Sequence, residues 1–285
     1  MSAKIPPTGR PMFTPELRRR LSEIARGKSL SSGPPPEPEP PAPSNYTLEF
    51  AFSGNESRND LGSFLVCEYR ASEMLTDINN VAAKFSSACS SIGIAPHKIL
   101  FLDLETCGLA NVPLFLIGTM TFSEDDLKVR QLFARDYSEE KPILAVISQM
   151  IAESDAVVSF NGKSFDLPYL KDRMTLHRLE FIPPGVHHDL VISARRKWRR
   201  SLPDCRLQTL EALICGRHRC GDIPGSEIPR LYHDYVKSGE LDPLLPVFKH
   251  NILDLVTMAE LLPELADQLH RPEAKSSNMR KRNDT

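Results

Sequence analysis

The sequence predicts an α/β fold with one mixed sheet, in which an antiparallel meander of three strands is joined by parallel strands and flanked by helices. Apolar runs at 98–105, 114–122 and 127–134 follow one another with short connections, which is typical of antiparallel strands. Beyond the third run, apolar strands alternate with helical patterns, and this order favours parallel strands in the same sheet. Further helical patterns predict additional C-terminal helices.

Each later element is assigned from the period of its apolar residues and from the turn residues that bound it. Asn161-Gly162, for example, is a turn signal that separates a strand from the helix after it. We expect strands at 155–160 and near 186–189. We expect helices at 139–153, about 166–177, 190–200, 206–215, 227–238 and 243–262.

The chain ahead of residue 98 differs in composition from the rest. Residues 14–26 begin like a helix with Thr-Pro, and the proline-rich stretch 31–43 predicts a stiff, extended linker. Residues 46–70 alternate as strands do, and the serine-rich "KFSSACSSIGIAPH" then leads into the main body. We predict a flexible arm with a proline-rich linker (1–45), an N-terminal strand extension packing on the main domain (46–97), the main domain (98–270) and a disordered tail (271–285).

Composition narrows the classes of protein that fit this chain of 285 residues. A hydrophobic share of 41% and a charged share of 25% are typical of a globular protein, and the net charge of −2 gives no overall basic field. Without a bilayer-length apolar run or a secretory signal, we expect a cytoplasmic protein and no membrane partner. The six cysteines are expected to be reduced, with zinc at Cys215, His218 and Cys220 as the alternative.

The most informative segment is "KILFLDLETCGL" at 98–109, where an apolar strand ends in two carboxylates. Side chains two apart on a strand share a face, so Asp103 and Glu105 are expected to point the same way. Two charges this close raise each other's pKa unless a cation lies between them, and hard oxygen ligands suit Mg²⁺ or Mn²⁺. A solvated strand end is the alternative interpretation.

Two further segments place carboxylates at the start or on one face of an expected helix. In "VVSFNGKSFDLPYL" (157–170), Asp166 follows a strand and a turn, where capping or decorating the helix start is the ordinary alternative. In "FKHNILDLVTMAELL" (248–262), His250 and Asp254 are one helical turn apart, although a surface pair has the same spacing. Each segment alone is a weak signal.

Together, the three segments suit phosphodiester hydrolysis with two metal ions. Their carboxylates would hold two divalent ions about 3.5–4 Å apart, one activating the attacking water and the other stabilising the departing oxygen. His250, with an ordinary pKa of about 6.5, would accept the proton of that water. The predicted metal ligands are Asp103, Glu105, Asp166 and Asp254.

Several motifs resemble those of a known nuclease family. "FLDLETCGL", "FNGKSFD" and "HNILD" resemble the three exonuclease motifs of the DEDD class, within the ribonuclease H-like (DnaQ-like) superfamily. The YprB-type ribonuclease H-like domain is more similar still, through "GSFLVCEYR", "HHDLVISARRKW", "LQTLEALICG" and "GDIPGSEIPRLYHDYVKSGE". The resemblance covers roughly residues 48 to 265, with the motifs in the same order, and implies a ribonuclease H-like fold.

The resemblance also implies an activity, a cofactor and a partner. The activity is 3′–5′ exonuclease hydrolysis of DNA or RNA, the cofactor is a pair of Mg²⁺ or Mn²⁺ ions, and the partner is nucleic acid with a single-stranded 3′ end. Carried over to this sequence, the family's acidic ligands fall on the four carboxylates already named, and its proton acceptor falls on His250.

A basic run around the single tryptophan, Trp198, predicts phosphate contacts with nucleic acid. The run contains Arg195, Arg196, Lys197, Arg199 and Arg200. Trp198 would stack on a base or fold onto the core, and Asn161 would bind substrate or fix its turn. Residues 217–219 would extend the basic patch or form an ordinary exposed loop, and Asp189 would cap the next helix or bind metal.

Two other functions remain open from the sequence. A nucleic-acid binding module of the same fold, silent in catalysis, would gain nothing from the mutual repulsion of intact carboxylates. A scaffold would recruit a protein partner through the N-terminal arm and its linker. Metal-dependent turnover separates the nuclease from the binding module, and deletion of residues 1–45 tests the scaffold.

Overall fold

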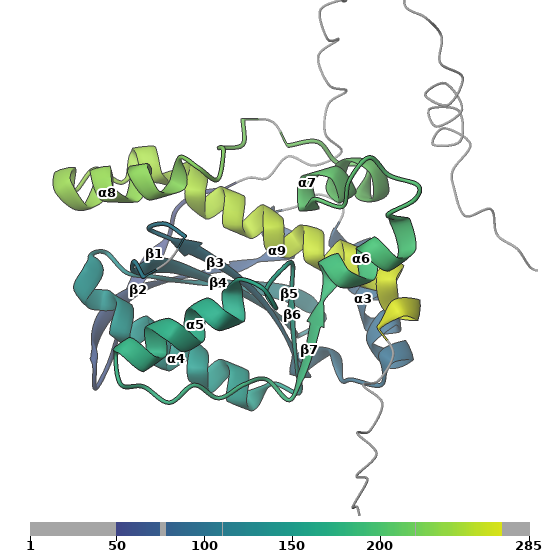
Figure 1. Cartoon of the computed structure of the whole chain (residues 1–285), viewed down its shortest axis with the longest axis horizontal. Coiled ribbons are helices and arrows are strands. Elements are labelled where there is room, and N and C mark those ends of the chain that lie inside the picture. The colour runs from purple at the N-terminus through teal and green to yellow at the C-terminus, as the bar shows by residue number, and fades with distance from the viewer. Residues whose placement is uncertain (1–49, 75–77, 110, 220, 270–285) are drawn as a thin grey trace, which may run out of the picture. The chain divides into compact units, whose positions relative to one another are not determined.

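The computed structural model describes residues 50–74, 78–109, 111–219 and 221–269. Within them, seven strands form one sheet in the order β1-β2-β5-β4-β3-β6-β7 (Figure 1). The strands are β1 Gly54–Asn59, β2 Gly62–Arg70, β3 Ile99–Thr106, β4 Leu114–Ser123, β5 Asp126–Phe133, β6 Ala156–Ser159 and β7 Val186–Asp189.

The sheet is mixed, as the sequence predicts. Strands β1 to β5 are joined by antiparallel pairs, whereas β6 pairs in parallel with both β3 and β7. β3 is therefore the strand at which the antiparallel and parallel halves of the sheet meet. The first pair, β1 and β2, extends the same sheet through β5. The predicted α/β class is confirmed.

Helices cover both faces of the sheet. They are α2 Ala71–Met74, α3 Ile78–Ile92, α4 Glu140–Glu153, α5 Asp166–Leu176, α6 Leu190–Trp198, α7 Leu207–Leu210, α8 Ile228–Ser238 and α9 Leu245–Leu265. α4 and α5 lie on one face, and α9 crosses the other face (Figure 1). α3 and α6 pack against α9, and α9 contacts β3 and β4 directly.

The alternation of side chains along β3 separates the two cores. Ile99 and Phe101 belong to the cluster formed with α3, α6 and α9. Leu102 and Leu104 belong to the other cluster, with the apolar side chains of α4 and α5. Since side chains two apart on a strand share a face, the residues at 103 and 105 point toward α9.

Three features of the fold differ from the sequence prediction. α3 was expected only as a serine-rich connection, because its serines conceal the one-turn spacing of Val81, Phe85 and Cys89, which are all buried. The predicted helix 206–215 begins as α7 and continues as a π-helix, Glu211–Cys215. The predicted helix 190–200 ends earlier, at Trp198.

Several predictions fall outside the described ranges. These are the helix at 14–26, the proline-rich linker, the C-terminal tail and Cys220 of the alternative zinc site. In the part of the chain that the structure covers, none of the helices has the length and apolar character needed to cross a bilayer.

Candidate active site

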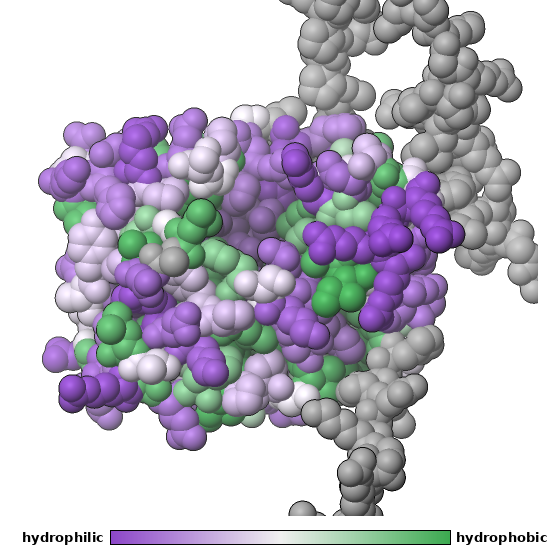
Figure 2. Space-filling model, viewed as in Figure 1, coloured by the Kyte–Doolittle hydropathy of each residue, from purple (hydrophilic) through white to green (hydrophobic). Residues whose placement is uncertain are grey.

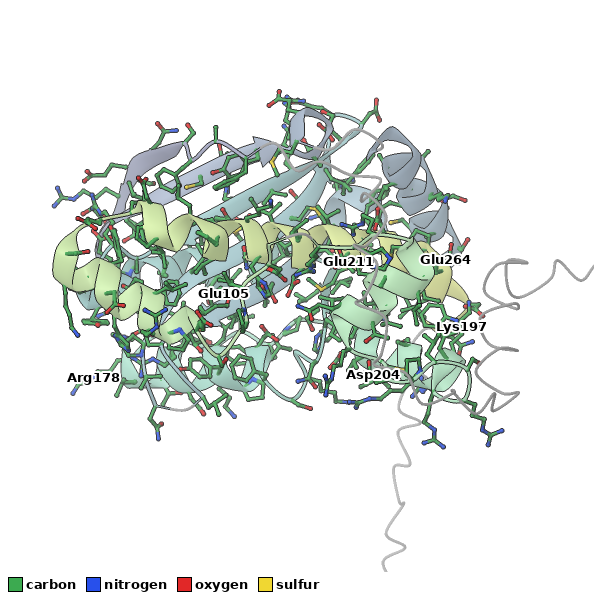
Figure 3. The ribbon with its side chains drawn as sticks, turned by 90° about the horizontal axis from the view of Figure 1, so that it is seen from above. Glu105, Arg178, Lys197, Asp204, Glu211 and Glu264 are labelled. Carbon is green, nitrogen blue, oxygen red and sulfur yellow. The ribbon has the colours of Figure 1, made fainter. Side chains whose placement is uncertain are left out.

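The site begins with two carboxylates on β3. Asp103 pairs with Gly118 of β4 and Glu105 pairs with Leu116, and the register shifts directly after Glu105. Both side chains point to the α9 side of the sheet, and Glu105 is 8% exposed. Seen from above, Glu105 lies alongside α9 (Figure 3). The strand therefore places a half-buried acid, Asp103, and a buried one, Glu105, on the α9 side of the sheet.

An amide of α9 fixes the first of these carboxylates. Asn251 Nδ2 donates to Asp103 Oδ2 at 2.7 Å, and its Oδ1 accepts from Gln131 Nε2 at 2.8 Å. Gln131 also donates to the carbonyl of Phe248 at 2.9 Å, so the chain of amides ties α9 to β5. This close approach requires Gly118, because a Cβ there would lie 2.1 Å from Asn251 Oδ1.

The third carboxylate, Asp166, is the first residue of α5 and is 5% exposed. Its carboxylate accepts a hydrogen bond from the backbone N–H of Leu104, the residue between the two acids of β3. The turn before α5 is held by Asp189, which accepts from the N–H of Asn161 at 2.8 Å and of Lys163 at 3.0 Å. Asp189 also caps α6, which confirms the capping role predicted for it.

The fourth carboxylate comes from α9, together with the histidine. His250 Nδ1 is 2.7 Å from Asp222 Oδ1, and His250 Nε2 is 3.6 Å from Asp254 Oδ2. Burial would lower the pKa of His250, but the hydrogen bond to Asp222 and the charge of Asp254 outweigh it and raise that pKa. The sequence had suggested an ordinary imidazole; the structure gives one flanked by two acids.

One arginine, Arg219, contacts three of the acidic side chains in this region. Arg219 Nη2 lies 2.5 Å from Asp254 Oδ1, Nη1 is 3.2 Å from Asp222 Oδ2, and Nε donates to Glu211 at 2.5 Å. The side chains of Arg217 and Arg219 are 2% and 5% exposed. Neither arginine extends a surface patch or belongs to an exposed loop, so both sequence interpretations of 217–219 are wrong for these two residues.

Burial and mutual repulsion raise the pKa of three of the carboxyl groups. For Asp103, burial acts first and the charges of Asp254 and Asp166 add to it, so its pKa is well above the usual value. For Glu105, burial and then the charge of Asp103 have the same effect. Burial raises the pKa of Asp166 to about 7. The charges of Asp166 and Asp254 raise the pKa of both Asp103 and Glu105, so the four predicted acids lie close together in one centre.

The donor set suits a divalent cation, although its present arrangement is not that of a formed metal site. Within the described ranges, no three His, Cys, Asp or Glu side chains are placed as ligands of a metal ion. The acids of the centre are nevertheless hard oxygen donors, buried together, and a cation would relieve the repulsion among them.

Comparison with known proteins identifies the family. Residues 100–266, more than half of the chain, match the family described as the RNase H superfamily. The chain belongs to the RNase H superfamily. Members of this superfamily are usually nucleases, and the mixed sheet described above is the ribonuclease H-like fold that the motifs predict.

A curated relative and a solved structure are also similar to this RNase H superfamily domain. The chain is 32% identical over 191 residues to "Uncharacterized protein YprB" of Bacillus subtilis (strain 168), which confirms the predicted YprB-type domain. The alignment covers 65% of this chain and 46% of YprB, so the chain spans less than half of that relative. The structure of the family B DNA polymerase from Pyrobaculum calidifontis gives a TM-score of 0.48 and 14% identity, covering 60% of this chain and 25% of that chain.

The predicted nucleic-acid contacts of the RNase H superfamily domain lie mainly on α6. Arg195, Arg196 and Arg199 are exposed, and Figure 2 shows strongly hydrophilic residues gathered over this helix. Lys197 instead contacts Asp267 at 3.1 Å and donates to a backbone carbonyl. Trp198 is 5% exposed and belongs to the core with α3 and α9, so the core interpretation holds.

Two further predictions concern Asn161 and the alternative zinc site. Asn161 is exposed and has a φ of 67°, which fits a turn-forming residue and leaves its side chain open to a substrate. Cys215 is a free thiol, and burial raises its pKa. With Cys220 outside the described ranges, the zinc alternative has no formed cluster among the residues described.

Sequence reasoning missed the residues that surround the acids. Asn251 follows His250 directly, so the "HN" pair was a signal for it. Asp222 and Arg219 reach the centre from irregular backbone, where no periodic pattern indicates which way a side chain points. Gly118 was indistinguishable from other strand glycines until Asn251 was seen against it.

The stability of the metal-free domain should fall as pH rises from about 4 to about 7. Burial raises the pKa of Asp166 from 3.8 to about 7, so the folded state binds more protons than the unfolded state across this interval, and stability then decreases with pH. The raised pKa values of Asp103 and Glu105 act in the same direction, and the raised pKa of His250 adds to the decrease only above its usual value of about 6.5. Thermal unfolding in chelator at several pH values measures this trend; stability rising from pH 4 to 7 would contradict it.

Proposed function

We propose that this domain is a metal-dependent nuclease that removes nucleotides from the 3′ end of DNA or RNA with two divalent ions. The observation that carries the proposal is the convergence of carboxylates from β3, α5 and α9 at one buried centre. Such a cluster raises the pKa of its own members, which is unfavourable for a protein that has no cation to place there. Membership of the RNase H superfamily supports the same chemistry.

The four acids are assigned to the metal ions. Asp103, Glu105, Asp166 and Asp254 would hold two Mg²⁺ or Mn²⁺ ions, which supply charge stabilisation and an activated water in this type of reaction. Asn251 keeps one oxygen of Asp103 in a fixed direction through its 2.7 Å hydrogen bond. The Leu104 N–H does the same for Asp166.

His250 is assigned the role of general base, which accepts the proton of the attacking water. Asp222 lies 2.7 Å from Nδ1 and so favours a hydrogen on that nitrogen, which leaves Nε2 as the atom that takes and returns a proton. Nε2 faces the acidic centre, 3.6 Å from Asp254. The neighbouring carboxylates stabilise the imidazolium that forms when His250 accepts a proton.

The exposed arginines of α6 are assigned to the phosphate backbone of the substrate, and Asn161 to its terminal nucleotide. Guanidinium groups bind phosphates without regard to base sequence, which suits an enzyme that proceeds along a strand. The net charge of −2 makes a local cluster of this kind the main source of attraction for nucleic acid.

A cleavage panel tests the function. The purified full chain is incubated with Mn²⁺ or Mg²⁺ and with DNA, RNA and hybrid substrates labelled at the 5′ or the 3′ end. We expect metal-dependent ladders that shorten from the 3′ end, and their distribution gives the sugar preference. Absence of cleavage on every substrate with either metal would refute the proposal.

Replacing Arg195, Arg196 and Arg199 together with Gln should weaken binding of single-stranded nucleic acid. Each lost phosphate contact on a single strand lowers the slope of log K against log salt by about 0.7, so the triple variant should lose about 2 from the slope. Fluorescence anisotropy at several salt concentrations measures it. Arg58→Gln is the control, since Arg58 is exposed on β1 at the opposite edge of the sheet. An unchanged slope would place the substrate elsewhere.

A second candidate is a binding module of the same fold without catalysis. The close contact of Arg219 with Asp254 favours it, since an arginine already supplies positive charge to the acids. Chelator separates the two functions. A binding module retains its affinity for nucleic acid in EDTA and shows no turnover, whereas the nuclease loses turnover when the metal is removed.

A further inference from the structure

Arg219 is the cation of the acidic centre in the metal-free protein. Its guanidinium meets Asp254 of α9, Asp222 and Glu211, at distances of 2.5, 3.2 and 2.5 Å. Its positive charge also lowers the pKa of Asp103, against the stronger effects of burial and of the other acids. A single side chain therefore offsets charge on several members of the centre.

The contact with Asp254 differs from the other contacts of Arg219. Nε and Nη1 donate hydrogen bonds to Glu211 and Asp222, and Nη2 lies 2.5 Å from Asp254 Oδ1. Of these three acids, only Asp254 is a predicted metal ligand. It is therefore the contact that a metal ion at Asp254 would replace, while the contacts with Glu211 and Asp222 can remain.

The surrounding ion pairs show that Glu211 does not depend on Arg219 alone. Arg217 Nη1 lies 3.0 Å from Glu211 Oε1, and Arg217 also contacts Glu260. Arg219 lies outside the helices and strands, while Asp103 and Asp254 are fixed on β3 and α9. Arg219 and its partner Asp222 thus both come from irregular backbone, whereas Asp103 and Asp254 belong to regular elements.

We propose that Arg219 is a displaceable counter-ion, which occupies the cation position at Asp254 until a divalent metal ion replaces it. The inference rests on the proposed function, because it assumes that Asp254 is a metal ligand. Arg219 then sets the metal concentration that the site requires, since each ion must compete with a resident positive charge. It also explains why the acids, as they stand, are not arranged as a formed metal site.

Direct measurement of Mn²⁺ binding tests the inference without reference to cleavage. Free Mn²⁺ is quantified by electron paramagnetic resonance in titrations of the full chain, as wild type, Arg219→Gln and Arg219→Lys. We expect Arg219→Gln to bind Mn²⁺ at least tenfold more tightly than wild type, and Arg219→Lys, which keeps the charge, to remain close to wild type. Arg206→Gln is the matched control, since the Arg206 side chain is 84% exposed.

Thermal unfolding supplies the second readout. In EDTA, Arg219→Gln should melt at a lower temperature than wild type, because the acids lose their counter-ion. Addition of Mn²⁺ should raise the melting temperature of Arg219→Gln by more than it raises that of wild type. If Arg219→Gln does not fold, Asp222→Asn removes one anchor of the guanidinium and should tighten Mn²⁺ binding at least threefold. Equal or weaker binding in the folded variants would make Arg219 a structural ion pair.

The outcomes distinguish this inference from the proposed function. Metal-dependent cleavage by wild type, with unchanged Mn²⁺ affinity in Arg219→Gln and Asp222→Asn, overturns the role of Arg219 and leaves the nuclease assignment intact. Absence of Mn²⁺ binding in wild type and in every variant overturns both.

Discussion

Replacing Asp103 with Asn is expected to reduce metal-dependent cleavage by roughly a thousandfold, or about 4 kcal/mol in the transition state, because under the proposed function it removes a charged metal ligand. The same change is expected to stabilise the metal-free protein. Burial and the neighbouring acids raise the pKa of Asp103 well above its usual value, so its carboxyl group opposes folding at neutral pH. An amide there has no charge to bury and still accepts from Asn251.

Both effects are measured on the same protein preparation. Initial rates on an end-labelled substrate give the loss of activity, and thermal unfolding in EDTA at neutral pH gives the change in stability, expected as a higher melting temperature than that of wild type. Asp172→Asn is the control, because Asp172 is exposed on α5. A variant at residue 103 that cleaves at the wild-type rate would show that this acid has no part in the reaction.

Gly118→Ala is expected to impair the site without changing any of its acids, because Gly118 lies against Asn251, the residue that holds Asp103. A Cβ at residue 118 would lie 2.1 Å from Asn251 Oδ1, so the Asn251 side chain must turn away or α9 must move, and in either case the amide can no longer hold Asp103 in place. Overpacking of this kind costs about 1–3 kcal/mol, and any movement of α9 would also displace His250 and Asp254. We therefore expect lower stability and at least a tenfold loss of cleavage from a single added methyl group.

The control for this substitution is another glycine. A Cβ at Gly225 would meet no atom within 4 Å, so Gly225→Ala should leave stability and cleavage close to wild type. Chemical denaturation in chelator measures the free energy of unfolding of both variants. A change of less than about 0.5 kcal/mol for Gly118→Ala would mean that the contact with Asn251 relaxes at little cost.

The sheet could be predicted from the sequence because its signals are local. Apolar runs with short connections gave the meander, and the alternation of side chains placed Asp103 and Glu105 on one face. α3 escaped prediction because serines occupy its exposed side and weaken the apolar period, although Phe85 and Cys89 are fully buried. Its serine-rich composition therefore led to a prediction of a connection, whereas packing of its buried residues against the core makes this segment a helix.

The acids of the candidate site were predictable and their partners were not. Asp103 and Asp166 each follow a strong apolar strand, so their segments were visible as motifs. Arg219 reaches the acids through the irregular backbone after the π-helix, and from the sequence it was expected in a basic patch or an exposed loop. Charge alone does not reveal whether an arginine faces solvent or a buried carboxylate.

The central claim is that acids from β3, α5 and α9 form one cation site. Anomalous diffraction from crystals of the full chain grown with Mn²⁺ tests it most directly. We expect manganese peaks within coordination distance of Asp103, with Glu105, Asp166 or Asp254 as further ligands. Saturating Mn²⁺ with no peak among these four side chains would contradict it.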